Sequence, residues 1–288
     1  MTAVAILAML VADLHQNTGT SFAASNMQRD LLKAEYLARS GINLTRMLVA
    51  QEPAIRKTVS PIYQAMLKSK PPQINVWQYA DIVLKPFSDY DGARSYLEGD
   101  GYDLGLTEGL GDTGGIFEVV AVAENGKINI NKPLFLDGDP ARISMADQLY
   151  SLMGGLQSPS KYDPLFNTLD EDGQLTTRLD VISNLIDWWD YDQYRTDYDP
   201  GAHEVATSPG EDDAFYQARK PSYQVKNAPF DTLEELRLVR GVSDDFWATF
   251  IEPDSDDPRS RTLTIYGSGS VNPNEATAAA LLARVCPA

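Results

Sequence analysis

The stretch QRDLLKAEYLARSGINLTRMLV, residues 28–49, decides the fold class because its apolar side chains recur every three or four positions. That spacing places one apolar stripe along one face of an α-helix. No proline occurs before Pro53, so we expect one long helix that ends near this residue. At 1.5 Å per residue, a helix of about 50 residues would be about 75 Å long. The stripe comprises Met27, Leu31, Ala34, Leu37, Ala38, Ile42, Leu44 and Leu48.

The N-terminal side of this helix begins with an apolar run, AVAILAMLVA, at residues 3–12. A membrane-spanning helix needs about twenty apolar residues. A secretory signal would place basic residues ahead of the run, and none is present. Two interpretations stay open: a buried helix end, or the C-terminal half of a membrane segment. We favour the membrane segment.

Downstream of the long helix, strand patterns flank a block of helical patterns. The sequence GIFEVVAVAENGKININ, residues 115–131, predicts a β-hairpin, and TLTIYGSGSVNPN, residues 262–274, predicts a last strand and turn. The Gly- and Asp-rich residues 89–115 read as loop, and strand signals are missing between residues 144 and 250. This order favours an α+β fold with a helical insertion. Helices are expected at 60–68, 145–153, 178–189, 211–219, 232–239 and 275–285.

Charge is divided unevenly along the chain, whose net charge is −17. Residues 1–70 hold eight Lys and Arg against four Asp and Glu, a net of +4, so the remainder carries −21. An acidic body would repel nucleic-acid phosphates and suits divalent cations or basic proteins better. The single cysteine, Cys286, excludes an internal disulfide. With only His15 and His203, centres built on several histidines are excluded too.

The stretch NLIDWWDYD, residues 184–192, places three aspartates beside two tryptophans. Residues 187–213 contain nine acids and one base, Arg195. Carboxylate oxygens in excess, without histidine or thiol, suit calcium better than zinc or copper. The candidate calcium ligands are Asp187, Asp190, Asp192, Glu211, Asp212 and Asp213.

Two other interpretations of this acidic segment stay open. It could be a solvated acidic loop, or two of its carboxylates could act as general acid and base in a periplasmic hydrolase. We interpret Trp188 and Trp189 as core anchors rather than sugar platforms. The nearby LDEDGQL, residues 169–175, is a turn and not an EF-hand, because loop position twelve falls on Leu179 instead of an acid.

Residues 233–250, LEELRLVRGVSDDFWATF, are similar to a helix-hairpin-helix, the element that clamps a DNA backbone. Ser243 replaces the second hairpin glycine, and Asp244 and Asp245 follow where a phosphate would lie. A DNA-binding module is therefore the weaker alternative. The favoured interpretation is a short helix pair that packs through Leu236, Val239 and Phe246.

Five segments occur in one order along nearly the whole chain. They are QRDLLKAEYLARSGINLTRMLV, NGKININ, LIDWWDYD followed by GEDDAFY, NAPFDTLEELRLVRGVSDDFW, and GSVNPNEATAAALLARV. This set resembles the minor pseudopilin K family of the type II secretion system. The resemblance implies a non-enzymatic structural protein at the tip of the pseudopilus, which assembles with minor pseudopilins of the I and J types during protein export.

The resemblance also implies an organisation. It predicts a pilin-like long N-terminal helix at 1–52, a small antiparallel sheet divided between 53–133 and 259–288, and a large inserted α-helical domain at 134–258. The helix would cross the inner membrane once and leave the head in the periplasm. A prepilin leader and some C-terminal structure are expected in relatives and have no counterpart in this sequence.

Family members bind calcium in the acidic region. By motif, the calcium ligands carry over to Asp187, Asp190 and Asp192, and then to Glu211, Asp212 and Asp213. The sequence PGAHE, residues 200–204, is a rival match for the second half, so Glu204 stays a candidate.

Overall fold

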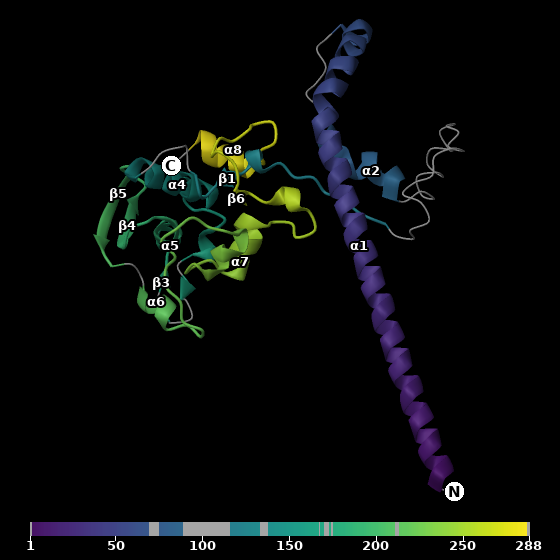
Figure 1. The fold of residues 1–288 in the computed structure, drawn as a ribbon. Helices are drawn as coiled ribbons and strands as arrows, with labels where there is room; N and C mark the ends of the chain where they lie inside the picture. The colour runs from purple at the N-terminus through teal and green to yellow at the C-terminus, as the bar shows by residue number, and fades with distance from the viewer. Residues whose placement is uncertain are drawn as a thin grey trace. The chain divides into compact units, whose positions relative to one another are not determined.

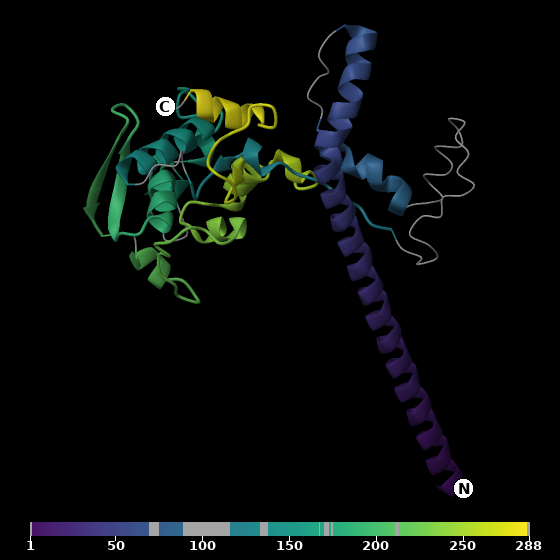
Figure 2. The same ribbon diagram turned by 45° about the horizontal axis from the view of Figure 1, so that its top comes forward.

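The structure is a computed structural model that describes residues 2–68, 75–88, 116–132, 138–166, 168–169, 173, 175–210 and 213–286. The chain divides into two compact units, Met1–Ala121 and Val122–Ala288. Both are drawn in Figure 1 and, turned, in Figure 2. The loop predicted at 89–115 lies outside the described residues. The α+β class, with a long N-terminal helix and small sheets, is confirmed.

The first unit is built on one helix, α1, which runs over Thr2–Leu67 and includes Pro53 and Pro61. The predicted end at Pro53 is therefore wrong, and the helix expected at 60–68 is part of α1. Each proline removes one backbone hydrogen bond and bends a helix without obliging it to end. Residues 42–67 contain no glycine, so the two prolines are not accompanied by a second kind of helix-breaking residue. Among the described residues, no helix has a stretch apolar and long enough to cross a bilayer.

Among the residues that the structure describes, the stripe of α1 has packing partners in its own unit only toward its C-terminal part. Helix α2 (Ala80–Ser88) buries Ala80 and Leu84. Together with Phe117 they form a small core against the stripe residues Leu37, Leu44 and Leu48. Gly41 allows this approach, because a Cβ there would lie 2.8 Å from the Phe117 ring.

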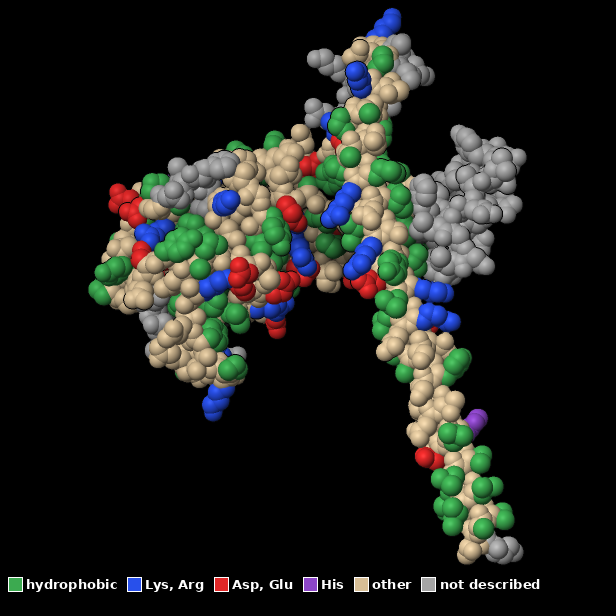
Figure 3. Space-filling model, in the orientation of Figure 1, with side chains coloured by type: hydrophobic (Ala, Val, Ile, Leu, Met, Phe, Trp, Pro, Cys, Tyr) green, Lys and Arg blue, Asp and Glu red, His purple; other side chains and the backbone are tan. Residues whose placement is uncertain are grey.

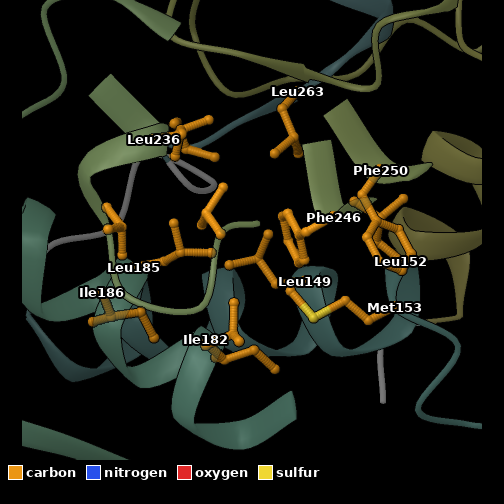
Figure 4. Packing of buried hydrophobic residues seen from close by; sticks show 14 of the residues in the cluster. Leu149, Leu152, Met153, Ile182, Leu185, Ile186, Leu236, Phe246, Phe250 and Leu263 are labelled. Carbon is orange, nitrogen blue, oxygen red and sulfur yellow. The ribbon is translucent and has the colours of Figure 1, made fainter. Parts of the chain in front are cut away.

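The second unit has its core between three helices and the segments that follow them. These helices are α4 (Asp139–Leu152), α5 (Arg178–Trp189) and α8 (Ala278–Val285). α4 packs against both α5 and α8. Figure 4 shows buried side chains of α4, α5 and the 244–251 segment gathered in one cluster. The buried side chains labelled there include Leu149, Leu152, Met153, Ile182, Leu185, Ile186, Phe246 and Phe250.

The shorter elements of this unit only partly follow the prediction. The helix expected at 211–219 is α6, Asp213–Gln217, and the one at 232–239 is a 3₁₀ helix, Leu233–Leu238. It is followed by α7, Asp244–Phe246, which continues as a π-helical turn, Trp247–Ile251.

The hairpin predicted at 115–131 is wrong. Its second half does form β1, Ile128–Asn129, but β1 pairs in parallel with β6, Leu263–Thr264. The described residues 116–123 form no strand. They precede the boundary between the two units, and Phe117 packs on α1 and α2 instead. The last strand expected within 262–274 is confirmed as β6.

Two antiparallel pairs occur where no strand is predicted, which is a second error. β2 (Thr168–Leu169) pairs with β3 (Leu175–Thr176), and β4 (Tyr194–Asp199) pairs with β5 (Glu204–Pro209). Acidic residues conceal the alternation in β4. Its Thr196 and Tyr198 are buried, while Asp197 between them and Asp199 after them are exposed.

Candidate functional site

Helix α5 carries the predicted aspartates at its C-terminal end. The helix begins with a capping box, in which Thr177 Oγ1 accepts a hydrogen bond from Asp180 N, and Asp180 Oδ2 accepts one from Thr177 N. It ends at its C-cap, Asp190, whose backbone N–H donates to Ile186 O. The fixed register of α5 therefore places Asp187 and Asp190 on consecutive turns.

The two tryptophans between these aspartates are core anchors, as predicted. Trp188 is 3% exposed and its ring packs on Tyr216, Tyr223 and Phe230, with centroids 5.7, 6.2 and 6.5 Å away. Trp189 Nε1 donates to Asn131 O at 3.1 Å. The turn of α5 that carries Asp187 and Asp190 is therefore held against the core by aromatic packing.

Asp187 connects α5 to the β4–β5 hairpin. Its carboxylate is buried, and Oδ1 accepts a hydrogen bond from Thr196 N at 2.8 Å. A carboxylate that accepts a backbone N–H in the interior fixes the position of the strand.

Asp190 and Asp192 both pair with Arg142, in the first turn of α4, a residue that no local sequence pattern singles out. Arg142 Nε lies 2.8 Å from Asp190 Oδ2, and Arg142 Nη2 pairs with Asp192 Oδ2. Arg142 Nη1 lies 3.0 Å from Asp139 Oδ1. One guanidinium therefore engages three carboxylates, which uses the fixed fork of N–H donors of arginine.

Burial governs the electrostatics of this cluster. The Asp190 side chain is 5% exposed, and burial raises its pKa to about 6, helped by the negative charge of Asp192 and opposed by Arg142. Burial disfavours the charge on Arg142, yet its carboxylate partners hold its pKa above the usual value. Asp190 Oδ1 is buried and has no hydrogen-bond partner. The carboxyl group of Asp190 accepts hydrogen bonds from Arg142 and from the backbone of Asp192, and both oppose the rise in its pKa.

The structure brings only part of the predicted ligand set together. Asp190 and Asp192 meet on Arg142, Asp187 points to β4, and Glu204 is exposed at the start of β5. Glu211 and Asp212 lie outside the described residues, and Asp213 is described only as the first residue of α6. Among the residues that are described, no group of three or more His, Cys, Asp and Glu side chains is placed to hold a metal ion. The calcium ligand set stays a prediction.

Residues 126–251 match the model of the family described as type II secretion system (T2SS), protein K. Residues 126–251 are therefore similar to protein K of the type II secretion system. This match agrees with the family that the five ordered segments indicate. No curated protein matches the chain. The protein K segment begins before β1 and ends at Ile251, so it includes α4, α5, the β4–β5 hairpin and the acidic cluster.

A second polar contact within the matched residues 126–251 was not predicted from the sequence either. Tyr198 Oη donates to Asp147 Oδ1 at 2.6 Å, and His203 Nδ1 lies 3.3 Å from the same oxygen. Burial and the hydrogen bond to Asp147 raise the pKa of Tyr198, so its hydroxyl stays protonated and donates. This contact attaches the β4–β5 hairpin to α4.

The segment at residues 233–250, which is similar to a helix-hairpin-helix, packs as the favoured interpretation predicts. Leu236, Val239 and Phe246 are all buried. The Asp244 side chain is 93% exposed, and it pairs with Arg237, whose guanidinium also lies 4.1 Å from the Trp247 ring centroid. Two acids, Asp244 and Asp245, begin α7, where they would repel a phosphate.

Proposed function

We propose that the chain is a non-enzymatic minor pseudopilin, located at the tip of the type II secretion pseudopilus. There it would assemble with minor pseudopilins of the I and J types and initiate or cap the fibre. The protein K match over residues 126–251 is the observation that carries this proposal. The acidic cluster fits a structural role, because a guanidinium bridges the carboxylates of Asp190 and Asp192.

The apolar surface of α1 supports assembly with sibling helices. Hydrophobic side chains cover its N-terminal part in Figure 3. Burying such side chains contributes about 25 cal/mol per Å² of apolar surface, so bundling of helices is a sufficient driving force. The exposed apolar residues of this part include Val4, Ile6, Leu7, Leu10, Leu14, Phe22, Met27 and Leu31.

We also propose an inner-membrane location, with α1 as the single anchor and the second unit in the periplasm. Two observations support it. The protein K family belongs to a secretion machine of the cell envelope, and the apolar run at residues 3–12 is exposed within this chain.

The assembly proposal is tested by co-purification of the tagged full chain with its I- and J-type neighbours. We expect the three proteins to elute together. Leu31→Glu places a charge in the exposed apolar stripe and should reduce the co-purified partners about tenfold or more, because burial of a leucine contributes about 1.5–3 kcal/mol.

Arg29→Glu is the matched control, since it introduces the same acid on a different face of α1 and should retain the partners. Both variants should melt at the wild-type temperature. Retention of both partners by Leu31→Glu would contradict the role of the stripe, and their absence from the wild-type preparation would contradict the assembly.

We further propose that the acidic segment binds calcium. Its residues fit this ion in two respects: every donor is a hard oxygen, and Asp190 Oδ1 is a buried oxygen without a partner. Calcium would supply positive charge that offsets the repulsion between the carboxylates and would connect the end of α5 to the segment before α6. The residues that would hold it are Asp187, Asp190, Asp192, Glu211, Asp212 and Asp213.

Chelation tests the calcium proposal. Calcium at a hundredfold excess over its dissociation constant would add about 2.7 kcal/mol of stability. Thermal unfolding of the full chain should therefore occur at a lower temperature in EDTA than in calcium. Asp190→Asn should lose most of this response, and magnesium should reproduce little of it. An unchanged melting temperature, with no metal in elemental analysis, would remove the calcium site.

A further inference from the structure

A cavity of about 390 Å³ in the second unit is lined by residues of β3, α5, α6 and the segment at residues 237–243. Cavities that bind ligands commonly have volumes of about 300–1,000 Å³. The lining includes the buried rings of Phe166 and Phe215. It also includes two leucines in contact with solvent, Leu169 and Leu238, which are 70% and 44% exposed. The cavity therefore combines buried apolar walls with exposed apolar side chains.

Three arginines, Arg219, Arg237 and Arg240, also line the cavity. The guanidinium carbons of Arg219 and Arg240 lie 4.2 and 4.7 Å from the centroid of the Phe215 ring. That of Arg237 lies 4.1 Å from the centroid of the Trp247 ring. A guanidinium that stacks by its face keeps its N–H donors at its edge. The lining residues that the structure describes include no Asp or Glu, so they gather basic side chains within a chain of net charge −17.

Thr176 gives a second, independent indication of a ligand. It lines the cavity and is 7% exposed, and its buried Oγ1 has no hydrogen-bond partner within the described part of the chain. A buried hydroxyl without a partner costs free energy, so most buried polar groups are paired. An oxygen acceptor of a ligand in the cavity would satisfy the Thr176 hydroxyl.

We propose that this cavity binds a short segment of another protein, in which an acidic residue stands next to an aliphatic one. The carboxylate pairs with the arginines, and the aliphatic side chain packs on Leu169 and Leu238. Arg237 already pairs with one carboxylate, that of Asp244. Because the Asp244 side chain is 93% exposed, this ion pair contributes little to stability, and an arriving carboxylate can replace it. The interaction is separate from assembly through α1.

The lining favours a peptide over a nucleic acid. A nucleic-acid backbone presents a series of phosphates, and the exposed leucines offer nothing to them. Asp244 and Asp245 directly follow Ser243, which lines the cavity, and they would repel neighbouring phosphates. A single carboxylate beside an aliphatic side chain matches both the arginines and the leucines.

Fluorescence anisotropy of labelled peptides mixed with the full chain tests the proposal. The probes are two amidated peptides with Leu-Glu or Glu-Leu at the centre of an alanine-serine host, each with a counterpart in which Gln replaces Glu. We expect at least one acidic peptide to bind about tenfold or more tightly than its Gln counterpart, because a carboxylate forms charge-assisted hydrogen bonds with a guanidinium. Arg237→Gln should remove most of this difference. Arg237→Lys should keep part of it, since lysine retains the charge and lacks the fork of donors.

Arg261→Gln is the matched control. The Arg261 side chain is 31% exposed, against 45% for Arg237, and it pairs with Glu252 at 2.6 Å instead of lining the cavity. Its replacement should leave the affinity for the acidic peptide within about twofold of the wild type. An equal loss in Arg237→Gln and Arg261→Gln would mean that general charge attraction, and not this cavity, holds the peptide.

Thr176→Val distinguishes a contact with the ligand from a contact within the fold. The variant should unfold at or above the wild-type temperature, because the hydroxyl has no partner to lose. It should bind the acidic peptide about threefold or more weakly, since one hydrogen bond to the ligand is removed. A lower unfolding temperature with unchanged peptide affinity would overturn the assignment of Thr176 to the site.

Three results would overturn the proposal as a whole. The first is equal binding of the acidic peptides and their Gln counterparts. The second is the absence of saturation by every peptide up to about 1 mM. The third is tighter binding of a labelled single-stranded DNA oligonucleotide that Arg237→Gln weakens, which would assign the cavity to nucleic acid.

Discussion

Trp188→Ala is expected to lower the free energy of unfolding of the second unit by about 3–5 kcal/mol, the usual cost of deleting a large buried aromatic side chain. Trp188 is 3% exposed and packs on three aromatic rings, those of Tyr216, Tyr223 and Phe230. Its removal would leave a cavity beneath the end of α5, and the acidic cluster would lose its support. Chemical denaturation of the full chain, followed by circular dichroism, measures the loss.

Tyr191→Ala is the control for this prediction. Tyr191 lies three residues further along, between Asp190 and Asp192, and is 77% exposed. Its truncation should change stability by no more than about 0.5 kcal/mol. Equal losses in the two variants would mean that Trp188 is not a core anchor.

Gly241→Ala is expected to cost about 2–4 kcal/mol, because it combines backbone strain with overpacking. Gly241 has φ = +87°, a conformation that residues with a side chain rarely adopt. A Cβ at this position would lie 2.6 Å from Val181 Cγ2 and 3.0 Å from Thr176 Cγ2. The strain and the contacts therefore act together. Denaturant unfolding measures the sum.

Gly210→Ala separates the two causes. Gly210 has a similar φ of +91°, but nothing lies within 4 Å of a Cβ built there. It should cost only about 1 kcal/mol, the contribution of the backbone. If Gly241→Ala is no worse than Gly210→Ala, the packing of the 233–250 segment against α5 is not as the structure places it.

Helices with a strong apolar period could be predicted from the sequence. Residues 178–189 form α5 as expected, because a capping residue begins a helix whose apolar positions repeat. The end of α1 could not be predicted from Pro53, since whether a proline ends or only bends a helix depends on its surroundings. The parallel pairing of β1 with β6 joins residues 135 positions apart, such as Ile128 and Leu263, which a local sequence pattern does not record.

The sequence predicts that acidic residues gather near residue 190, but it does not predict which side chains they contact. The aspartates near residue 190 stand out by number, yet their shared partner, Arg142, comes from another helix with no local signal. The same acids concealed the β4–β5 hairpin, because the alternation of buried Thr196 and Tyr198 with aspartates reads as an acidic loop. Contacts with residues distant in the sequence therefore decide whether an acidic segment forms a loop, a strand or a buried ion-pair cluster.

The most direct test of the account is deletion of the gene for this chain in its own host, followed by measurement of the proteins released into the medium. The account predicts that secreted proteins accumulate in the periplasm and that a plasmid copy of the wild-type gene restores their release. Unchanged release in the deletion strain would contradict the assignment of this chain to the type II secretion pseudopilus.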